Sequence, residues 1–333
     1  MEQCGESKGR CMARGWTFYL PALLVAAVLV ACAVVLLAVS EGAEAAFPGK
    51  NGRIAYESND VIYTISPGGT GNTKVTGGDL PSYSPDGERI AYSQFTGTDV
   101  EIYTIDPDGS GKTQLTRNKN KDDNWPSYSP NGKRIVYSRI TYRRINDHTV
   151  SVDPRDEKIF TVKVGGGGKT KVTKGSNPSY SPDGERIVYE GFDETSSKRF
   201  PDKEIYTINV RGGDKTQLTH NSKDDLNPDY SPDGKRIAYV HTSGTQDEGN
   251  VDSDIYTIKV GGGDKSRVTY TDKADEYYPS YSPDGERIAY ALYTNDYRQS
   301  DIYTIDASGG GRTRVTNTDD NAFVEGPSWG SRP

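Results

Sequence analysis

The chain has 333 residues, of which 33% are hydrophobic, and it contains 37 Gly, 23 Tyr and 18 Pro. This composition is typical of many short strands and turns and predicts an all-β body. The formal net charge is −7, and Lys and Arg are interleaved with Asp and Glu. Because no one-sided basic stripe occurs, DNA- and RNA-binding proteins are excluded as a class. Cys4, Cys11 and Cys32 all precede the body, which leaves no thiol there for a disulfide, a zinc thiolate site or a Cys nucleophile.

Residues 1–45 are predicted to be a signal peptide or a membrane anchor. No charge occurs from Trp16 to Val39, basic residues precede this run and acidic residues follow it, which orients the body out of the cytoplasm. The run is long enough to span a bilayer, and Ala43-Glu44-Ala45 is a pattern that a signal peptidase can cut. The sequence leaves open whether this segment is cleaved or retained, and lipidation of Cys32 is a minor alternative. The body is therefore expected to be secreted, periplasmic or membrane-anchored, and to touch the membrane only through this segment.

One phrase, P-S-Y-S-P-D-G-x-R-I-A-Y, recurs about every 50 residues, which is the length of a propeller blade. Its copies begin at Pro81, Pro126, Pro178, Pro228 and Pro279. The phrases I-Y-T-I and K-T-x-L/V-T follow in the same unit, so four strand-sized segments form one antiparallel blade. Ser-Pro-Asp-Gly predicts a tight hairpin turn, because Pro presets φ, Asp caps the turn and Gly takes a positive φ.

The two ends of the body predict the number of blades. The segment from Asn51 onward begins at the second strand of a unit, and the chain finishes on Pro327-Ser328-Trp329, which repeats the first strand. The C-terminal strand is therefore expected to complete blade 1. The sequence predicts one domain over residues 46–333, a six-bladed β-propeller of four-stranded blades.

The general form of the phrase, P-x-[YWF]-S-P-D-G-x-x-I-A-[YF], resembles the WD40-like Pro-Asp repeat of the TolB-like six-bladed propeller family. The resemblance covers residues 47 to 333. It implies a periplasmic or extracellular scaffold that binds protein partners, such as components of cell-envelope complexes.

The sequence predicts different turns and loops on the two faces of such a propeller. The Ser-Pro-Asp-Gly turns and the Gly-rich turns share one face, which we call the SPDG face. The second-to-third strand loops and the blade-to-blade connections share the other, which we call the loop-rich face. Three long loops are predicted there, Arg139 to Lys158, Gly191 to Lys203 and His241 to Asp252. Long loops on a rigid scaffold are typical of binding sites.

The blade-to-blade connections of the loop-rich face supply the candidate partner-binding residues. These are Asp122, Asp123, Trp125, Asp224, Asp225, Asp275, Glu276 and Tyr277. A ring of such residues near the channel could bind a basic partner or a cation; the alternative is that they are solvated loop charges, diluted by neighbouring lysines. No cofactor is predicted, and a cation in the central channel is left open because sequence cannot show converging carboxylates.

Two other motifs are weaker. His148, His220 and His241 lie at no short ligand spacing, so a shared transition-metal site is not expected. Gly326-Pro327-Ser328-Trp329-Gly330 matches G-x-S-x-G, but Ser328 is the serine of the repeat phrase and no helix follows it.

The sequence therefore favours a non-enzymatic, monomeric binding module for a protein, a peptide or a surface polymer, without nucleic acid. One alternative is a propeller hydrolase or lyase that acts at the channel mouth through carboxylates such as Asp224 and Asp275. The other is a structural spacer or a sensor ectodomain.

Overall fold

The computed structural model describes residues 49–332 except for 147–148, 194–200, 244–251, 272–273, 295–298 and 319–321. The chain divides into two compact units, Met1–Gly42 and Ala43–Pro333, and only the second contains described residues. The predicted signal peptide or anchor over residues 1–45 lies outside the described residues. Within the described part, no helix is long and apolar enough to cross a membrane.

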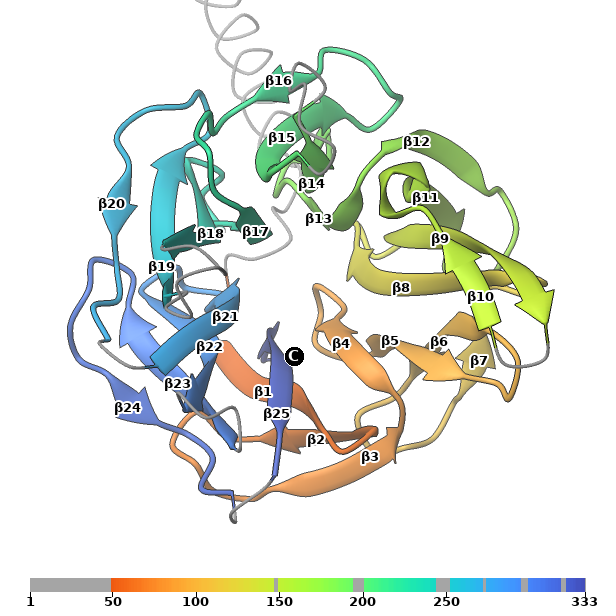
Figure 1. Ribbon diagram of the computed structural model, residues 1–333. Helices are drawn as coiled ribbons and strands as arrows, with labels where there is room; N and C mark the ends of the chain where they lie inside the picture. Colours follow the sequence, from red (N-terminus) through yellow and green to blue (C-terminus); the bar gives the residue numbers. More distant parts are fainter. Residues whose placement is uncertain are drawn as a thin grey trace, which may run out of the picture. The chain divides into compact units, whose positions relative to one another are not determined.

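The described residues form six β-sheets, which we number as blades 1 to 6 in chain order (Figure 1). Blade 1 contains, from its innermost strand outward, β25 (Val324–Ser331), β1 (Asn51–Ser58), β2 (Val61–Ile65) and β3 (Thr73–Gly77). Blade 2 contains β4 (Asp79–Tyr83), β5 (Ile90–Phe95), β6 (Val100–Ile105) and β7 (Thr113–Gln114). Blade 3 contains β8 (Lys121–Tyr128), β9 (Arg134–Asn146), β11 (Lys158–Lys163) and β12 (Thr170–Lys174), with β10 (Thr149–Val152) added beside β9.

Blades 4 to 6 repeat the same order. Blade 4 contains β13 (Ser176–Tyr180), β14 (Arg186–Phe192), β15 (Lys203–Asn209) and β16 (Thr216–Gln217). Blade 5 contains β17 (Asp225–Tyr230), β18 (Arg236–Ser243), β19 (Asp252–Lys259) and β20 (Ser266–Arg267). Blade 6 contains β21 (Ala274–Tyr281), β22 (Arg287–Thr294), β23 (Ser300–Asp306) and β24 (Thr313–Arg314). The predicted all-β fold of six antiparallel blades is confirmed.

The last strand of the chain, β25, lies antiparallel to β1. Trp329 is opposite Ile54 and Ser328 is opposite Ala55 in the register of this pair. Blade 1 is therefore built from the first three described strands and the last one.

Hydrophobic residues pack between neighbouring blades. Ala55 and Ile62 of blade 1 contact Tyr83, Ile90 and Tyr92 of blade 2. Corresponding clusters join the other neighbours, blades 6 and 1 included. Both faces of the central strands are buried because each blade is covered on both sides, which is why Ile, Ala and Tyr of the I-A-Y phrase can follow one another directly.

The Ser-Pro-Asp-Gly segments form the predicted tight turns. In blade 2, Ser84 Oγ accepts a hydrogen bond from the backbone amide of Arg89 at 2.8 Å, and Asp86 Oδ1 accepts one from Glu88 N at 3.0 Å. Gly87 has a φ of 73°, which glycine adopts without steric cost. The turn thus fixes the register of the first two strands of the blade.

The prediction of a long loop from Arg139 to Lys158 was wrong. Strand β9 continues to Asn146, β10 pairs with it, and the 3₁₀-helix η1 (Pro154–Asp156) leads into β11. Residues 140–143 and 149–152 alternate apolar and polar side chains, which is typical of strands. The other two predicted loops begin and end in strands, and their central residues, 194–200 and 244–251, lie outside the described residues.

Candidate binding site at the channel mouth

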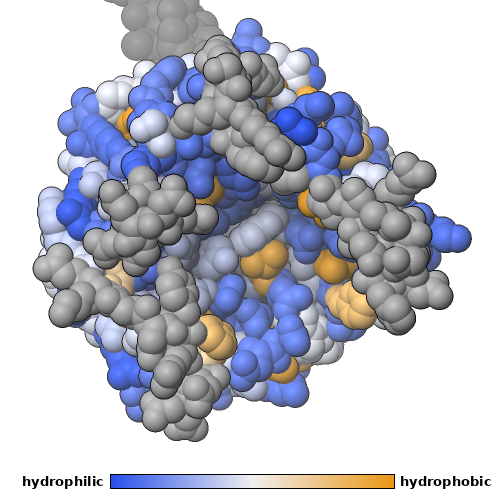
Figure 2. All heavy atoms as spheres, viewed as in Figure 1, coloured by the Kyte–Doolittle hydropathy of each residue, from blue (hydrophilic) through white to orange (hydrophobic). Residues whose placement is uncertain are grey.

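The innermost strands of the six blades face the centre of the propeller (Figure 1), and residues of all six strands line a cavity there, which we call the central channel. One end of the channel is lined by the residues that precede the repeated prolines, and we call these residues the channel mouth: Leu80, Trp125, Asn177, Asn227, Tyr278 and Gly326. The cavity there has a volume of about 120 Å³, and Figure 2 shows the hollow at the centre of the propeller. Each innermost strand runs from a blade-to-blade connection toward a Ser-Pro-Asp-Gly turn, so the channel mouth opens on the loop-rich face.

The backbone of the channel mouth is left-handed in all six blades, with φ from 48° at Asn177 to 58° at Trp125. The strand register shifts at the same place, for example between Asn124 and Ser127 in blade 3. This is a β-bulge, which bends a strand and re-aims a side chain. For a residue with a Cβ atom the conformation costs on the order of 1 kcal/mol, and five of the six mouth residues have one.

Two aromatic side chains from opposite blades meet at the channel mouth. Trp125 of blade 3 and Tyr278 of blade 6 have ring centroids 5.6 Å apart and planes inclined by 30°. Both side chains are half-buried. Trp125 was predicted as a candidate binding residue, whereas Tyr278 was not. The predicted neighbour Tyr277 instead packs between blades, with its hydroxyl 3.0 Å from Ser253 Oγ.

Below the channel mouth lies a ring of six side chains, one from each blade. We call them the channel ring: Ser82, Ser127, Ser179, Asp229, Ser280 and Ser328. These residues border both the cavity at the mouth and a second cavity of about 50 Å³. Asp229 is the single carboxylate of the ring. Its Oδ1 accepts a hydrogen bond from Ser179 Oγ at 3.1 Å and its Oδ2 accepts one from Tyr281 N at 2.9 Å, while burial raises its pKa to about 6.

The six predicted acidic residues lie away from this channel, at the junctions between blades. Asp122 and Asp224 occupy equivalent positions and bind the preceding blade. Asp122 Oδ1 accepts a hydrogen bond from Val100 N at 2.8 Å, and Asp224 Oδ1 accepts one from Lys203 N at 2.7 Å. Burial raises the pKa of both carboxyls. Each side chain therefore caps the start of the third strand of the blade before it.

Asp123 and Asp225 are completely buried, each opposite a basic residue on the next strand. Asp123 accepts two hydrogen bonds from Arg139, at 2.6 and 2.7 Å. Asp225 Oδ1 lies 2.6 Å from Nδ1 of His241. These contacts join the first and second strands of one blade, β8 to β9 and β17 to β18, and neither buried side chain is available to a ligand in this conformation.

Asp275 and Glu276 are also buried, with 5% and 0% of their surface exposed. Glu276 occupies the position of Asp123 and Asp225, but the residue opposite it is Leu292. Thr269 Oγ1 lies 3.3 Å from Glu276 Oε2. Burial first, and then the nearby charge of Asp254, raise the pKa of Glu276 to about 8.

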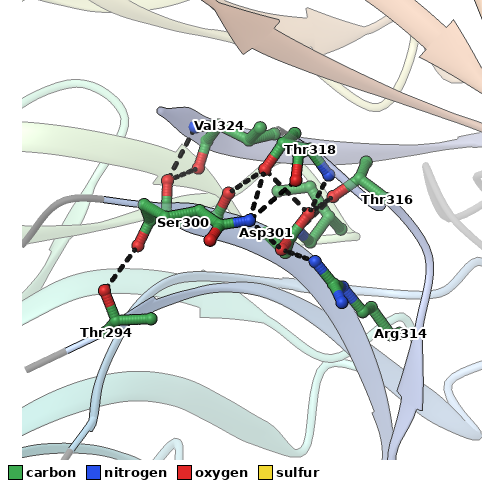
Figure 3. Close-up of polar contacts among 9 residues, drawn as sticks. Thr294, Ser300, Asp301, Arg314, Thr316, Thr318 and Val324 are labelled. Atoms are coloured by element: carbon green, nitrogen blue, oxygen red, sulfur yellow. Dashed lines mark hydrogen bonds and ion pairs between the residues drawn. The ribbon is translucent and has the colours of Figure 1, made fainter. Parts of the chain in front are cut away.

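A second acidic position, which sequence analysis missed, recurs immediately before the I-Y-T-I phrase. In blade 6 it is Asp301, whose Oδ1 accepts hydrogen bonds from Thr316 Oγ1 at 2.7 Å and from Thr318 N at 3.0 Å (Figure 3). Thr316 Oγ1 in turn accepts a hydrogen bond from Ile302 N at 2.9 Å. Glu101, Glu204 and Asp254 occupy the same position in blades 2, 4 and 5. The contact joins the third and fourth strands of a blade, and so it serves the fold.

One further group of carboxylates could hold a cation. Oxygen atoms of Glu57, Asp60 and Asp79 lie within 4.8 Å of one another. Burial, together with the neighbouring carboxylates, raises the pKa of Glu57 to about 7 and that of Asp79 to about 6. Of the histidines, His241 is bound to Asp225, His220 is exposed, and His148 lies outside the described residues.

Residues 150–330 match the TolB beta propeller domain family. No curated protein matches the chain. Among solved structures, TolB from Acinetobacter baumannii is 24% identical, with a TM-score of 0.65 over 85% of this chain and 68% of that chain.

A chain of a nidogen/laminin complex is 10% identical, with a TM-score of 0.59 over 82% of this chain and 98% of that chain. An oligogalacturonate lyase in complex with manganese is 16% identical, with a TM-score of 0.50 over 78% and 71%. At these identities the solved structures show a shared fold.

Proposed function

This chain belongs to the TolB beta propeller domain family, whose match covers more than half of its residues, and on that premise we propose that it is an extracytoplasmic binding module. It docks a protein or a peptide of the cell envelope on its loop-rich face, at the channel mouth. It works as a monomer and binds its partner without chemical conversion.

The aromatic pair Trp125–Tyr278 carries this proposal. The two rings lie 5.6 Å apart at the edge of a cavity of about 120 Å³. Half-buried aromatic side chains at a concave surface are typical anchors for ligands, because they offer a large apolar area at a low entropy cost. Trp125 and Tyr278 both lie in β-bulges, where their backbone is in the strained left-handed conformation. Backbone strain of this kind is concentrated at functional sites.

The exposed hydrophobic residues also support a binding site on the loop-rich face. Among the described residues, the exposed large hydrophobic side chains are Phe95, Tyr270 and Phe323, exposed by 62%, 72% and 36%. Phe95 ends the second strand of blade 2, whereas the other two lie in blade-to-blade connections. All three therefore belong to the loop-rich face. Aromatic residues are enriched in protein interfaces relative to the rest of the surface.

The first described residues of the propeller contact the opposite face, the SPDG face. Gly49 N donates a hydrogen bond to Pro283 O at 3.3 Å, and Asn51 Nδ2 donates one to Asp284 Oδ2 at 2.7 Å. Both contacts lie at the Ser-Pro-Asp-Gly turn of blade 6. The chain thus enters the propeller at the SPDG face, and the loop-rich face is the end remote from that point.

Photo-crosslinking in the source cell tests the proposal. A benzoylphenylalanine residue in place of Phe95 should give a discrete adduct with one envelope protein or peptide, identified by mass spectrometry. The matched control places the same group at Glu185, an exposed residue of a turn on the SPDG face. Adduct formation at Glu185 alone, or the same adducts from both positions, would contradict a partner site on the loop-rich face.

A further inference from the structure

We propose that the channel ring binds the ammonium group of a peptide ligand, a lysine side chain or an N-terminal amine, through Asp229. This inference rests on the proposed function, because it assigns the chemistry of the group that the docked peptide places in the channel.

Asp229 is a buried carboxyl group with neutral neighbours in the channel ring. Asp229 accepts hydrogen bonds from the Ser179 hydroxyl and from the backbone amides of Tyr281 and Tyr230, and among the described residues it forms no ion pair with Lys, Arg or His. The other five members of the channel ring are serines, whose hydroxyls accept hydrogen bonds. A site of one carboxylate surrounded by neutral acceptors is complementary to a group with a single positive charge and three donors, which describes an ammonium.

The contact between neighbouring blades does not need a carboxylate at position 229. Tyr281 N donates to Asp229 Oδ2 at 2.9 Å. The equivalent amides in other blades donate to serine, Trp329 N to Ser280 Oγ at 3.2 Å and Tyr83 N to Ser328 Oγ at 3.0 Å. Serine therefore completes the inter-blade contact, and the carboxylate at this one position is unfavourable in the absence of a cation, in agreement with its pKa of about 6.

The size of the channel also favours an ammonium group. The cavity beyond the ring measures about 50 Å³, which admits only a few water molecules. A compact ammonium on an unbranched chain fits such a space better than the planar guanidinium of arginine. The aromatic faces of Trp125 and Tyr278 border the path to the ring, and such faces attract cations.

Isothermal titration of the full chain with N-acetyl-lysine amide tests the inference, with N-acetyl-norleucine amide as the probe that lacks only the ammonium. Saturable binding of the lysine probe is expected, with affinity at least tenfold above that of the norleucine probe. The variant Asp229→Ser restores the residue that the other blades carry, so it should fold, which thermal unfolding checks. It should lower the affinity for the lysine probe at least tenfold, and adding Ser280→Asp to this variant should recover binding.

The affinity of the wild type should also fall as the pH drops below about 6, where Asp229 becomes protonated. Equal affinity for the two probes, or an unchanged affinity in Asp229→Ser, would overturn the inference. Displacement of the lysine probe by calcium chloride at lower concentration would assign the ring to a metal ion and also overturn it. If Asp229 does not bind an ammonium group, the crosslink at Phe95 should still form. If the propeller has no partner on its loop-rich face, that crosslink should be absent.

Discussion

Glu276 should make the propeller less stable as the pH rises from about 5 to about 8. The carboxyl is 0% exposed and its pKa is raised to about 8 from its ordinary 4.5. The folded protein therefore holds a proton that the unfolded chain releases near pH 4.5. The stability that this protonated group contributes is fully present below pH 4.5 and is lost as the pH rises through 8. The loss is at most about 1.4 kcal/mol for each pH unit between these two values.

Glu276→Gln isolates this effect, because glutamine has the shape of the protonated acid. Equilibrium urea denaturation of the wild type and the variant at pH 5, 6, 7 and 8 measures it. The two proteins should have similar free energies of unfolding at pH 5, and the variant should be increasingly more stable toward pH 8, by up to several kcal/mol. Other buried carboxyls, such as Glu204 with its pKa of about 7, contribute to both proteins and cancel in the difference. A constant difference between the two proteins across this range would refute the reasoning.

Three other substitutions test separate parts of the fold by the same denaturation assay. Asp123→Asn should destabilise the protein by about 3 kcal/mol, because it leaves the buried guanidinium of Arg139 without its counter-charge; a loss below 1 kcal/mol would contradict the buried ion pair. Thr316→Val removes the hydroxyl that bridges Asp301 and the amide of Ile302, and should cost about 2 kcal/mol; full stability would mean that the bridge is not formed. Gly175→Ala places a methyl group 2.5 Å from a carbonyl oxygen of the neighbouring strand at a φ of 140° and should cost more than 3 kcal/mol; a change under 1 kcal/mol would show that the strand relaxes.

The repeated phrases predict the fold because each one encodes a local feature. Pro, Asp and Gly of the Ser-Pro-Asp-Gly segment set the turn within four residues, as at Ser84 to Gly87. In the strand that follows the turn, Ile, Ala and Tyr are all buried, because neighbouring blades cover both of its faces. The segment after Arg139 was misread because its length suggested a loop, although residues 140–143 and 149–152 alternate as strands do.

The candidate site was predicted less well, because it depends on register between strands that are distant in sequence. The pairing of Asp123 with Arg139, or of Asp225 with His241, follows from which residues face each other across two strands, and the repeat does not specify this. The acidic residues accordingly looked like a ring around the channel, whereas the structure places four of the six in buried blade junctions.

Tyr278 and Asp229, which the sequence analysis did not single out, carried a signal in the repeat. Aligning the copies on their prolines places Trp125 and Tyr278 at one position of the repeat, so their common location follows from the repeat alone. The same alignment shows aspartate at 229 where the other copies have serine. A charged residue at a position that the fold fills with a small neutral one indicates a role outside the fold.

The affinity of the full chain for the partner captured at Phe95, measured with and without Trp125→Ala, tests the central claim most directly. Truncating a central aromatic anchor typically costs 2 kcal/mol or more, on the order of a thirtyfold loss of affinity. We predict a loss of at least tenfold with unchanged thermal stability, and no loss for Glu185→Ala on the SPDG face. An affinity within twofold of the wild type for Trp125→Ala would contradict a binding site at the channel mouth.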